Sequence, residues 1–265
     1  MSKVSVLIPT YKPGWYLQRC LQSIEEQTLP KDKFKVYIAL NGPKDNFEEV
    51  IHSALESTNF DYEFFYLELA SVSNARNYLI ENSTEEYIVF VDDDDLLSEN
   101  YLEELLRVSS EDTIGVSNVY NFIDSIDNRK ESYIGKCFQS LEEKTTSKYK
   151  SRKYFSSPWA KMIHRIIIKD VRFDINLAIG EDSLFMAQLS NRVKSVRKTA
   201  ESACYFVNER EGSATRKKID KQNELQRIIY LLKQYGKMLL SFRYDKLFVM
   251  TRAMATIVHG RRLFK

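Results

Sequence analysis

The chain has 265 residues, 43% of them hydrophobic, and a net charge of +2. This length allows one large core, and three widely spaced cysteines without a CxxC pair argue against a disulfide framework or a thiolate zinc site. No apolar run is long enough for a secretory signal or a transmembrane helix. We therefore expect a cytoplasmic protein that is soluble or peripheral on the inner face of the cell membrane.

The first 120 residues alternate between strand and helix patterns. β-branched and aromatic content predicts strands at residues 4–9, 34–40, 61–69, 87–91 and 113–120. Apolar spacing predicts a helix over 15–27 and another over 73–83, the latter opened by a capping serine, Ser73. This alternation indicates an α/β fold with a mixed, mainly parallel sheet flanked by helices. Residues 124–153 are polar and turn-rich, and the apolar pattern resumes after them.

Four consecutive aspartates, at positions 92 to 95, follow the apolar run 87–91. Ligands of parallel sheets bind beyond the carboxyl ends of strands. Adjacent carboxylates repel each other, so a cation is expected beside them. An EF-hand loop is excluded, because leucines stand where it needs an acid and a glycine. A solvated acidic turn and a Mg²⁺ or Mn²⁺ site for a phosphorylated ligand remain, and no P-loop or GxGxxG is present to bind phosphate instead.

Four segments in order, "VSVLIPTYK", "SVSNARN", "FVDDDDLL" and "GEDSLF", resemble the inverting family 2 glycosyltransferases of the GT-A fold, in particular members that make bacterial capsule and O-antigen polysaccharides. The resemblance covers Val4 to Phe185, about two thirds of the chain. It implies a Rossmann-like nucleotide-binding domain, a nucleotide-sugar donor such as a UDP-sugar, and Mn²⁺ or Mg²⁺. It also implies transfer with inversion to a hydroxyl group of a saccharide or lipid-linked saccharide.

The resemblance assigns roles to single positions. It implies donor binding by Pro9, Thr10, Tyr11, Asn41, Asn74, Arg76, Asp92 and Asp93, and metal binding by Asp94 and Asp92. Asp95 matches an extra acid that is common after the DxD motif. Asn41, in "LNGP", stands where the family usually has the second aspartate of "DDGS", and an amide can still pair with a pyrimidine edge. As alternatives, Arg76 could be a surface charge paired with Glu81, and Thr10 and Tyr11 could simply turn the chain.

The acceptor hydroxyl must lose a proton, so a carboxylate is needed as general base. Glu181 and Asp182 follow Gly180 at the start of a predicted helix, a position that helix capping also favours for acids. By resemblance, Asp182 is the catalytic base and Glu181 binds the acceptor. Trp159 is expected to stack on an acceptor sugar or to anchor the core. The segment that contains Arg210 and Arg216 resembles one that closes over the donor diphosphate in some family members, and a solvated charge run is the alternative.

The carboxyl-terminal part is strongly basic. Thr215 to Lys265 contains thirteen Lys or Arg and three acids, a net of +10, which leaves −8 for the first 214 residues. We expect a GT-A domain at residues 1–215 and a basic amphipathic helical extension at 216–265. Its pattern favours adsorption to an anionic membrane surface, with packing on the domain or a homodimer interface as alternatives.

Two other functions are weighed at this point. A haloacid-dehalogenase-like phosphatase also has a strand that ends in DxD, but that family needs the motif after its first strand, and here three predicted strands precede it. A membrane-binding or nucleic-acid-binding module could use the basic tail, although the acidic front part argues against nucleic acid as the main partner.

Overall fold

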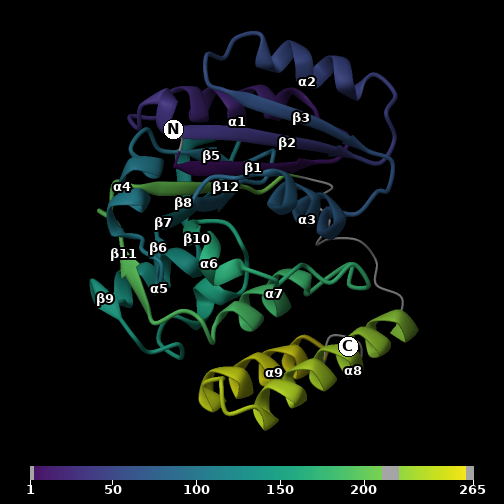
Figure 1. Cartoon of the computed structure of the whole chain (residues 1–265), viewed down its shortest axis with the longest axis vertical. Helices are drawn as coiled ribbons and strands as arrows, with labels where there is room; N and C mark the ends of the chain where they lie inside the picture. Colours follow the sequence, from purple (N-terminus) through teal and green to yellow (C-terminus); the bar gives the residue numbers. More distant parts are fainter. Residues whose placement is uncertain (1–2, 211–220, 261–265) are drawn as a thin grey trace.

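The computed structural model describes residues 3–210 and 221–260, and its main feature is an eight-stranded sheet (Figure 1). The strand order is β3 (Tyr62–Leu67), β2 (Phe34–Asn41), β1 (Val4–Thr10), β4 (Tyr87–Phe90), β10 (Lys161–His164), β6 (Thr113–Val116), β11 (Ser195–Lys198) and β9 (Lys144–Thr145). β1 pairs in parallel with β2 and β4, β2 with β3, and β6 with β11, while β10 runs antiparallel between β4 and β6. The predicted mixed, mainly parallel sheet is confirmed.

Helices connect the strands and follow the last of them. They are α1 (Trp15–Glu25), α2 (Phe47–Leu55), α3 (Val72–Asn82), α4 (Tyr101–Val108), α5 (Tyr133–Ser140), α6 (Arg165–Ile168), α7 (Glu181–Leu189), α8 (Lys221–Leu240) and α9 (Lys246–Gly260), with short 3₁₀ helices η1 (Lys31–Lys33) and η2 (Arg152–Phe155). All seven residues of β1 are buried, because a parallel sheet is covered on both faces and its strands are hydrophobic throughout.

The start of α3 differs from the sequence prediction. Ser73 was expected to cap this helix, but the cap is Ser71, whose hydroxyl accepts the backbone N–H of Asn74 at 3.2 Å. Ser73 lies inside the helix and is buried. A capping hydroxyl needs an extended backbone at its own residue, and Ser71 has it with φ −150°.

A second sheet has the order β5 (Leu96–Leu97), β12 (Cys204–Asn208), β7 (Asn118–Ile123) and β8 (Ser125–Glu131). The predicted single strand at 113–120 is therefore wrong: it is two strands, β6 and β7, which belong to different sheets. The break is Ser117, whose N–H donates to the carbonyl of Ala160 at 3.2 Å. The polar stretch 124–153 contains β8, which is almost wholly exposed and so lacks the alternation that marks a half-buried strand.

The carboxyl-terminal helices α8 and α9 pack side by side at the end of the molecule farthest from α2 (Figure 1). Their buried residues, among them Leu231, Tyr235 and Phe248, belong to the same core cluster as the sheet. Phe248 contacts Phe155 of η2 with 5.1 Å between the ring centroids. The predicted division at 215/216 falls among residues 211–220, outside the described part of the chain, and stays a prediction.

Candidate functional site

The four aspartates after β4 form a turn in which two side chains are buried and two are partly exposed. The backbone N–H of Asp95 donates to the carbonyl of Asp92 at 3.1 Å, which closes the turn. Asp93 and Asp95 are buried, whereas Asp92 and Asp94 are partly exposed. The first and third carboxylates of the run are therefore the two that a ligand can reach.

The two buried aspartates anchor the turn to neighbouring strands. The hydroxyl of Thr10, at the end of β1, donates to Asp93, and the backbone N–H of Asn208 on β12 donates to Asp95 at 2.8 Å. Burial raises the pKa of Asp93 to about 7, with a further increase from the neighbouring carboxylates, although the Thr10 bond opposes it. These residues hold the shape of the site, and Thr10 does more than turn the chain.

Arg76 joins the aspartate turn to the acid pair of α7. It projects from α3 and is buried, with one terminal nitrogen 3.0 Å from Asp92 and the other 2.6 Å from Asp182. Burial lowers the pKa of Arg76, but the surrounding carboxylates outweigh it and the net pKa is above the ordinary value, so the guanidinium stays charged. Glu81, the alternative partner, pairs with Arg172 instead at 3.0 Å.

The acids at the start of α7 differ in their ionisation. Gly180 precedes them with φ +92°, a left-handed conformation that a glycine adopts without strain. Burial raises the pKa of Glu181 to about 8, and Asp182 raises it further while Arg76 opposes. Burial also raises the pKa of Asp182, but Arg76 lies nearer to it, at 2.6 Å compared with 3.9 Å for Glu181. The ion pair with Arg76 therefore favours the anionic form of Asp182, whereas the raised pKa of Glu181 favours its protonated form at neutral pH.

The predicted base-binding residues lie at the ends of β1 and β2. The amide of Asn41 donates to the carbonyl of Thr10 at 2.7 Å and so ties the two strand ends together. Tyr11 is 47% exposed, and Gly42 lies beneath it, where a Cβ atom would approach the ring within 2.7 Å. Pro9 is buried within β1, and Asn74 is partly exposed in the first turn of α3. The structure gathers these residues around β1, β2 and α3.

Asp94, the predicted metal ligand, contacts Arg210. The guanidinium of Arg210 forms an ion pair with Asp94 and lies over the ring of Tyr16, 4.2 Å from its centroid. Arg210 thus reaches the DxD motif, as expected of a residue near a diphosphate. Its predicted companion, Arg216, lies outside the described residues.

Trp159 lies between the core and the surface. Its ring stacks on that of Tyr205, with 5.1 Å between centroids and 10° between planes. The neighbouring Ala160 has φ +58°, which is rare for a residue other than glycine. Next to it, Lys161 is buried and donates to the carbonyls of Ser157 at 2.6 Å and Trp159 at 2.5 Å. Burial lowers the pKa of Lys161 to about 7, although Asp182 opposes this.

Sequence reasoning missed several positioning residues. The hydroxyl of Tyr205 accepts the backbone N–H of Asp92 at 3.1 Å and bonds to Asp95, so it fixes the turn from β12. Asn77 makes two bonds of 2.8 Å with the backbone of Phe173, whose ring lies 5.3 Å from the Arg76 guanidinium carbon. The only available signal for Asn77 was its place in the "SNARN" segment.

A divalent metal fits this site only together with a ligand. Among the described residues, no three His, Cys, Asp or Glu side chains are arranged to hold an ion. Five carboxyl groups nevertheless interact with Arg76, Lys161 or Arg210, namely Asp92, Asp93, Asp94, Glu181 and Asp182. Mg²⁺ in proteins is commonly bound by one or two carboxylates completed by substrate phosphates. Asp92 and Asp94 are suited to that kind of site.

Solved structures with the same fold come from Staphylococcus aureus. Residues 1–349 of TarS in complex with UDP-GlcNAc superpose with a TM-score of 0.79 and 18% identity, over 98% of this chain and 74% of that one. The complex of the same fragment with UDP gives a TM-score of 0.75 and 17% identity, over 98% and 72%. The GT-A fold expected from the sequence is confirmed.

Curated relatives extend the comparison. Glycosyltransferase GlyA of Streptococcus pneumoniae is 30% identical over 81% of this chain, and poly(ribitol-phosphate) beta-N-acetylglucosaminyltransferase TarS of S. aureus is 22% identical over 80%. The chain spans only 32% and 36% of the length of these two proteins. The family model for glycosyl transferase family 2 matches residues 5–172, a region that includes the whole aspartate turn and Arg76. Since this match covers more than half of the sequence, the chain belongs to glycosyl transferase family 2.

Proposed function

We propose that the chain transfers a sugar from a UDP-sugar to a hydroxyl group of a saccharide or polyol acceptor, with inversion at the anomeric carbon and with Mn²⁺ or Mg²⁺ at Asp94 and Asp92. The observation that carries the proposal is the Arg76 bridge, which holds the candidate base Asp182 and the DxD residue Asp92 on one buried guanidinium. The TarS fragment with the same fold is in complex with UDP-GlcNAc, which supports a uridine nucleotide as donor.

The arrangement suits a direct displacement. In an inverting transfer the acceptor oxygen attacks the anomeric carbon from the side opposite the leaving diphosphate. Asp182 receives the proton of that hydroxyl, while Arg76, 2.6 Å away, keeps the carboxylate ionised and oriented. Asp92, on the other nitrogen of Arg76, and Asp94, beside Arg210, would be the carboxylates nearest the diphosphate. A metal ion bound there would supply neutralisation of its charge.

The phosphatase alternative receives no support from the structure. The strand that leads into DxD is β4, the fourth in the chain, whereas that family needs the motif after its first strand. The family assignment and the fold agree in favouring sugar transfer.

Metal-assisted donor binding can be tested by calorimetry of UDP binding. With Mn²⁺ present, we expect UDP to bind at least about tenfold more tightly than with EDTA, about 1.4 kcal/mol. Asp94→Ala should remove this difference, whereas Asp61→Ala, which changes an exposed carboxylate elsewhere, should preserve it. If the wild type binds UDP equally well with Mn²⁺ and with EDTA, the metal-binding part of the proposal is wrong.

A further inference from the structure

Helices α8 and α9 each bury one side and leave the opposite side open. On α8 the buried side contains Ile228, Leu231, Tyr235 and Met238, and on α9 it contains Phe248, Val249, Arg252 and Thr256. With 3.6 residues per turn, the exposed apolar residues of both helices fall about half a turn away from these. The two helices pack on each other at the end of the molecule (Figure 1), so their open sides form an outer layer.

We call this layer the outer face. It consists of Leu225, Ile229, Lys233, Lys237 and Leu240 on α8, Phe242 in the connecting turn, and Leu247, Met250, Met254, Ile257 and Val258 on α9. The most exposed of them are in or next to the turn, where Leu240 is 84% and Phe242 fully exposed. Large apolar side chains gathered in this way usually mark a surface that another molecule covers.

The charges on and beside the outer face are cationic. Lys233, Lys237, Arg243 and Lys246 are all exposed. Within residues 221–260, Glu224 is buried and paired with Arg227, and Asp245 accepts the backbone N–H of Phe248 at 2.9 Å at the start of α9. An apolar surface interspersed with lysines, whose aliphatic stems add to it, is complementary to an anionic lipid bilayer.

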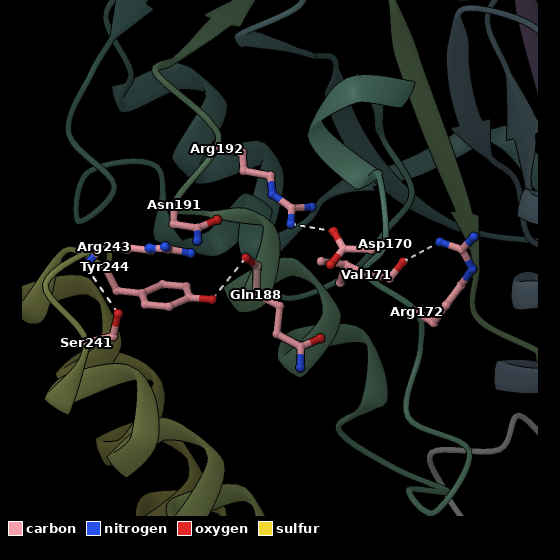
Figure 2. Close-up of a pocket in the computed structure, with 9 residues that line it drawn as sticks. All are labelled: Asp170, Val171, Arg172, Gln188, Asn191, Arg192, Ser241, Arg243 and Tyr244. Carbon is pink, nitrogen blue, oxygen red and sulfur yellow. Dashed lines mark hydrogen bonds and ion pairs between the residues drawn. The ribbon is translucent and has the colours of Figure 1, made fainter.

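A cavity of about 460 Å³ opens beside the same turn (Figure 2). Ser241, Arg243 and Tyr244 of the turn line it, together with Asn191 and Arg192, which follow α7. Arg192 already pairs with Asp170, also in the lining, at 2.5 Å, whereas the Arg243 guanidinium makes no hydrogen bond or ion pair with another described residue. In Figure 2, Arg243 extends from the turn toward Asn191.

The cavity is suited to an anion that also carries hydroxyl groups. Arg192 and Arg243 line the cavity together with Tyr244, and their positive charges oppose the rise in the pKa of Tyr244 that burial causes. The side-chain oxygen of Asn191 is buried and has no hydrogen-bond partner among the described residues, so it can accept a hydrogen bond from a hydroxyl group. A phosphate ester of a polyol, as in a glycerophospholipid headgroup, offers both groups.

We propose that the outer face docks the protein onto an anionic bilayer and that Arg243 binds a lipid phosphate in the adjoining cavity. Phe242 and Leu240 enter the interface next to that phosphate, and the lysines contact neighbouring headgroups. Neither α8 nor α9, nor any other helix in the described ranges, is long and apolar enough to cross a membrane. The helices therefore lie along the interface, where stable binding needs an apolar signal and a basic one together. The inference stands independently of the proposed transfer reaction.

Flotation of the full chain with large unilamellar vesicles tests this docking. We expect binding to vesicles of phosphatidylcholine with phosphatidylglycerol and little binding to phosphatidylcholine alone. Arg243→Gln should lower the partition coefficient about fivefold, the effect of one cation near an anionic surface. Phe242→Ser should lower the partition coefficient about tenfold, because the variant no longer buries a phenylalanine ring in the bilayer. Ile166→Ser and Lys144→Gln, which change exposed residues elsewhere, should bind as the wild type does.

Three other results would overturn the proposal. The first is equal binding of the wild type, Arg243→Gln and Phe242→Ser to the anionic vesicles. The second is a thermal shift with soluble glycerol phosphate that Arg243→Gln removes, in a protein that does not float with vesicles, which would identify a free phosphate ligand. The third is a dimer in sedimentation velocity that Phe242→Ser dissociates, again without vesicle binding, which would identify a second copy as the occupant.

Discussion

Replacing Asp182 by asparagine separates proton transfer from donor binding. The amide has nearly the size of the carboxyl group, and its oxygen can still accept the bond from Arg76, which is 2.6 Å long in the wild type. Arg76 also keeps its 3.0 Å ion pair with Asp92, so the positive charge of the buried guanidinium is still balanced by one carboxylate. The substitution removes the basic charge and leaves the rest of the site in place.

Asp182→Asn should lower the transfer rate strongly and the affinity for UDP only slightly. A positioned general base typically contributes ~10² to 10⁴ in rate, or ~3 to 5 kcal/mol of activation free energy. Because Asp182 is used as the acceptor attacks, UDP affinity should stay within about twofold of the wild type. The matched variant is Glu181→Gln. Glu181 has a pKa of about 8 and is mostly neutral at pH 7, so replacing its carboxyl group by a neutral amide should leave most of the transfer rate.

The assay measures UDP release from a panel of UDP-sugars with candidate saccharide and polyol acceptors, and calorimetry measures UDP affinity for each variant. UDP-GlcNAc is the first donor to try, because the TarS fragment is in complex with it. If Asp182→Asn transfers sugar at a near-normal rate while Glu181→Gln is inactive, the roles of the two acids are reversed and the reasoning from their pKa values is wrong.

Two further predictions concern stability. The pKa of Glu181 is raised from 4.5 to about 8, so its contribution to the free energy of unfolding is fully present below pH 4.5 and is lost as the pH rises through 8. Unfolding in urea should therefore show a stability difference between the wild type and Glu181→Gln that falls over this range, and a constant difference would contradict the assignment. Asn41→Asp, which restores the usual family residue, places a buried carboxylate against the carbonyl of Thr10 in place of the 2.7 Å bond. It should cost about 1–3 kcal/mol of stability, and an unchanged urea midpoint would show that Asn41 does not need this bond.

The resemblance assigned Arg76, Asp92 and Asp182 to one active site, and the structure brings the three side chains into one ion-pair network. Local patterns also located β4 and α7, because a buried strand and a glycine-led helix have clear signals. What could not be predicted are contacts between distant segments. Tyr205 bonds to a residue 113 positions away, and Asn77 to one 96 positions away, and no spacing in a single sequence encodes such pairs.

The turn of four aspartates shows a related limit. The repulsion between adjacent carboxylates predicted a nearby cation, but it could not predict that each of the four carboxylates has its own hydrogen-bond or ion-pair partner. Asp93 and Asp95 bond within the fold, and only Asp92 and Asp94 pair with arginines at a partly exposed edge. Which side a residue of a turn faces depends on the strands that meet there, here β1 and β12, and these are far apart in the chain.

The guanidinium of Arg76 has a thermodynamic consequence. Arg76 pairs with Asp92 through one nitrogen and with Asp182 through the other. A ligand that breaks the ion pair with Asp92 would leave the positive charge of Arg76 to Asp182, and this would lower the proton affinity of the Asp182 carboxylate. Linkage is reciprocal, so protonation of Asp182 must weaken donor binding by the same factor. The two parts of the site are therefore coupled through a single side chain, and donor affinity should fall as Asp182 becomes protonated at low pH, by no more than the roughly twofold change expected of Asp182→Asn.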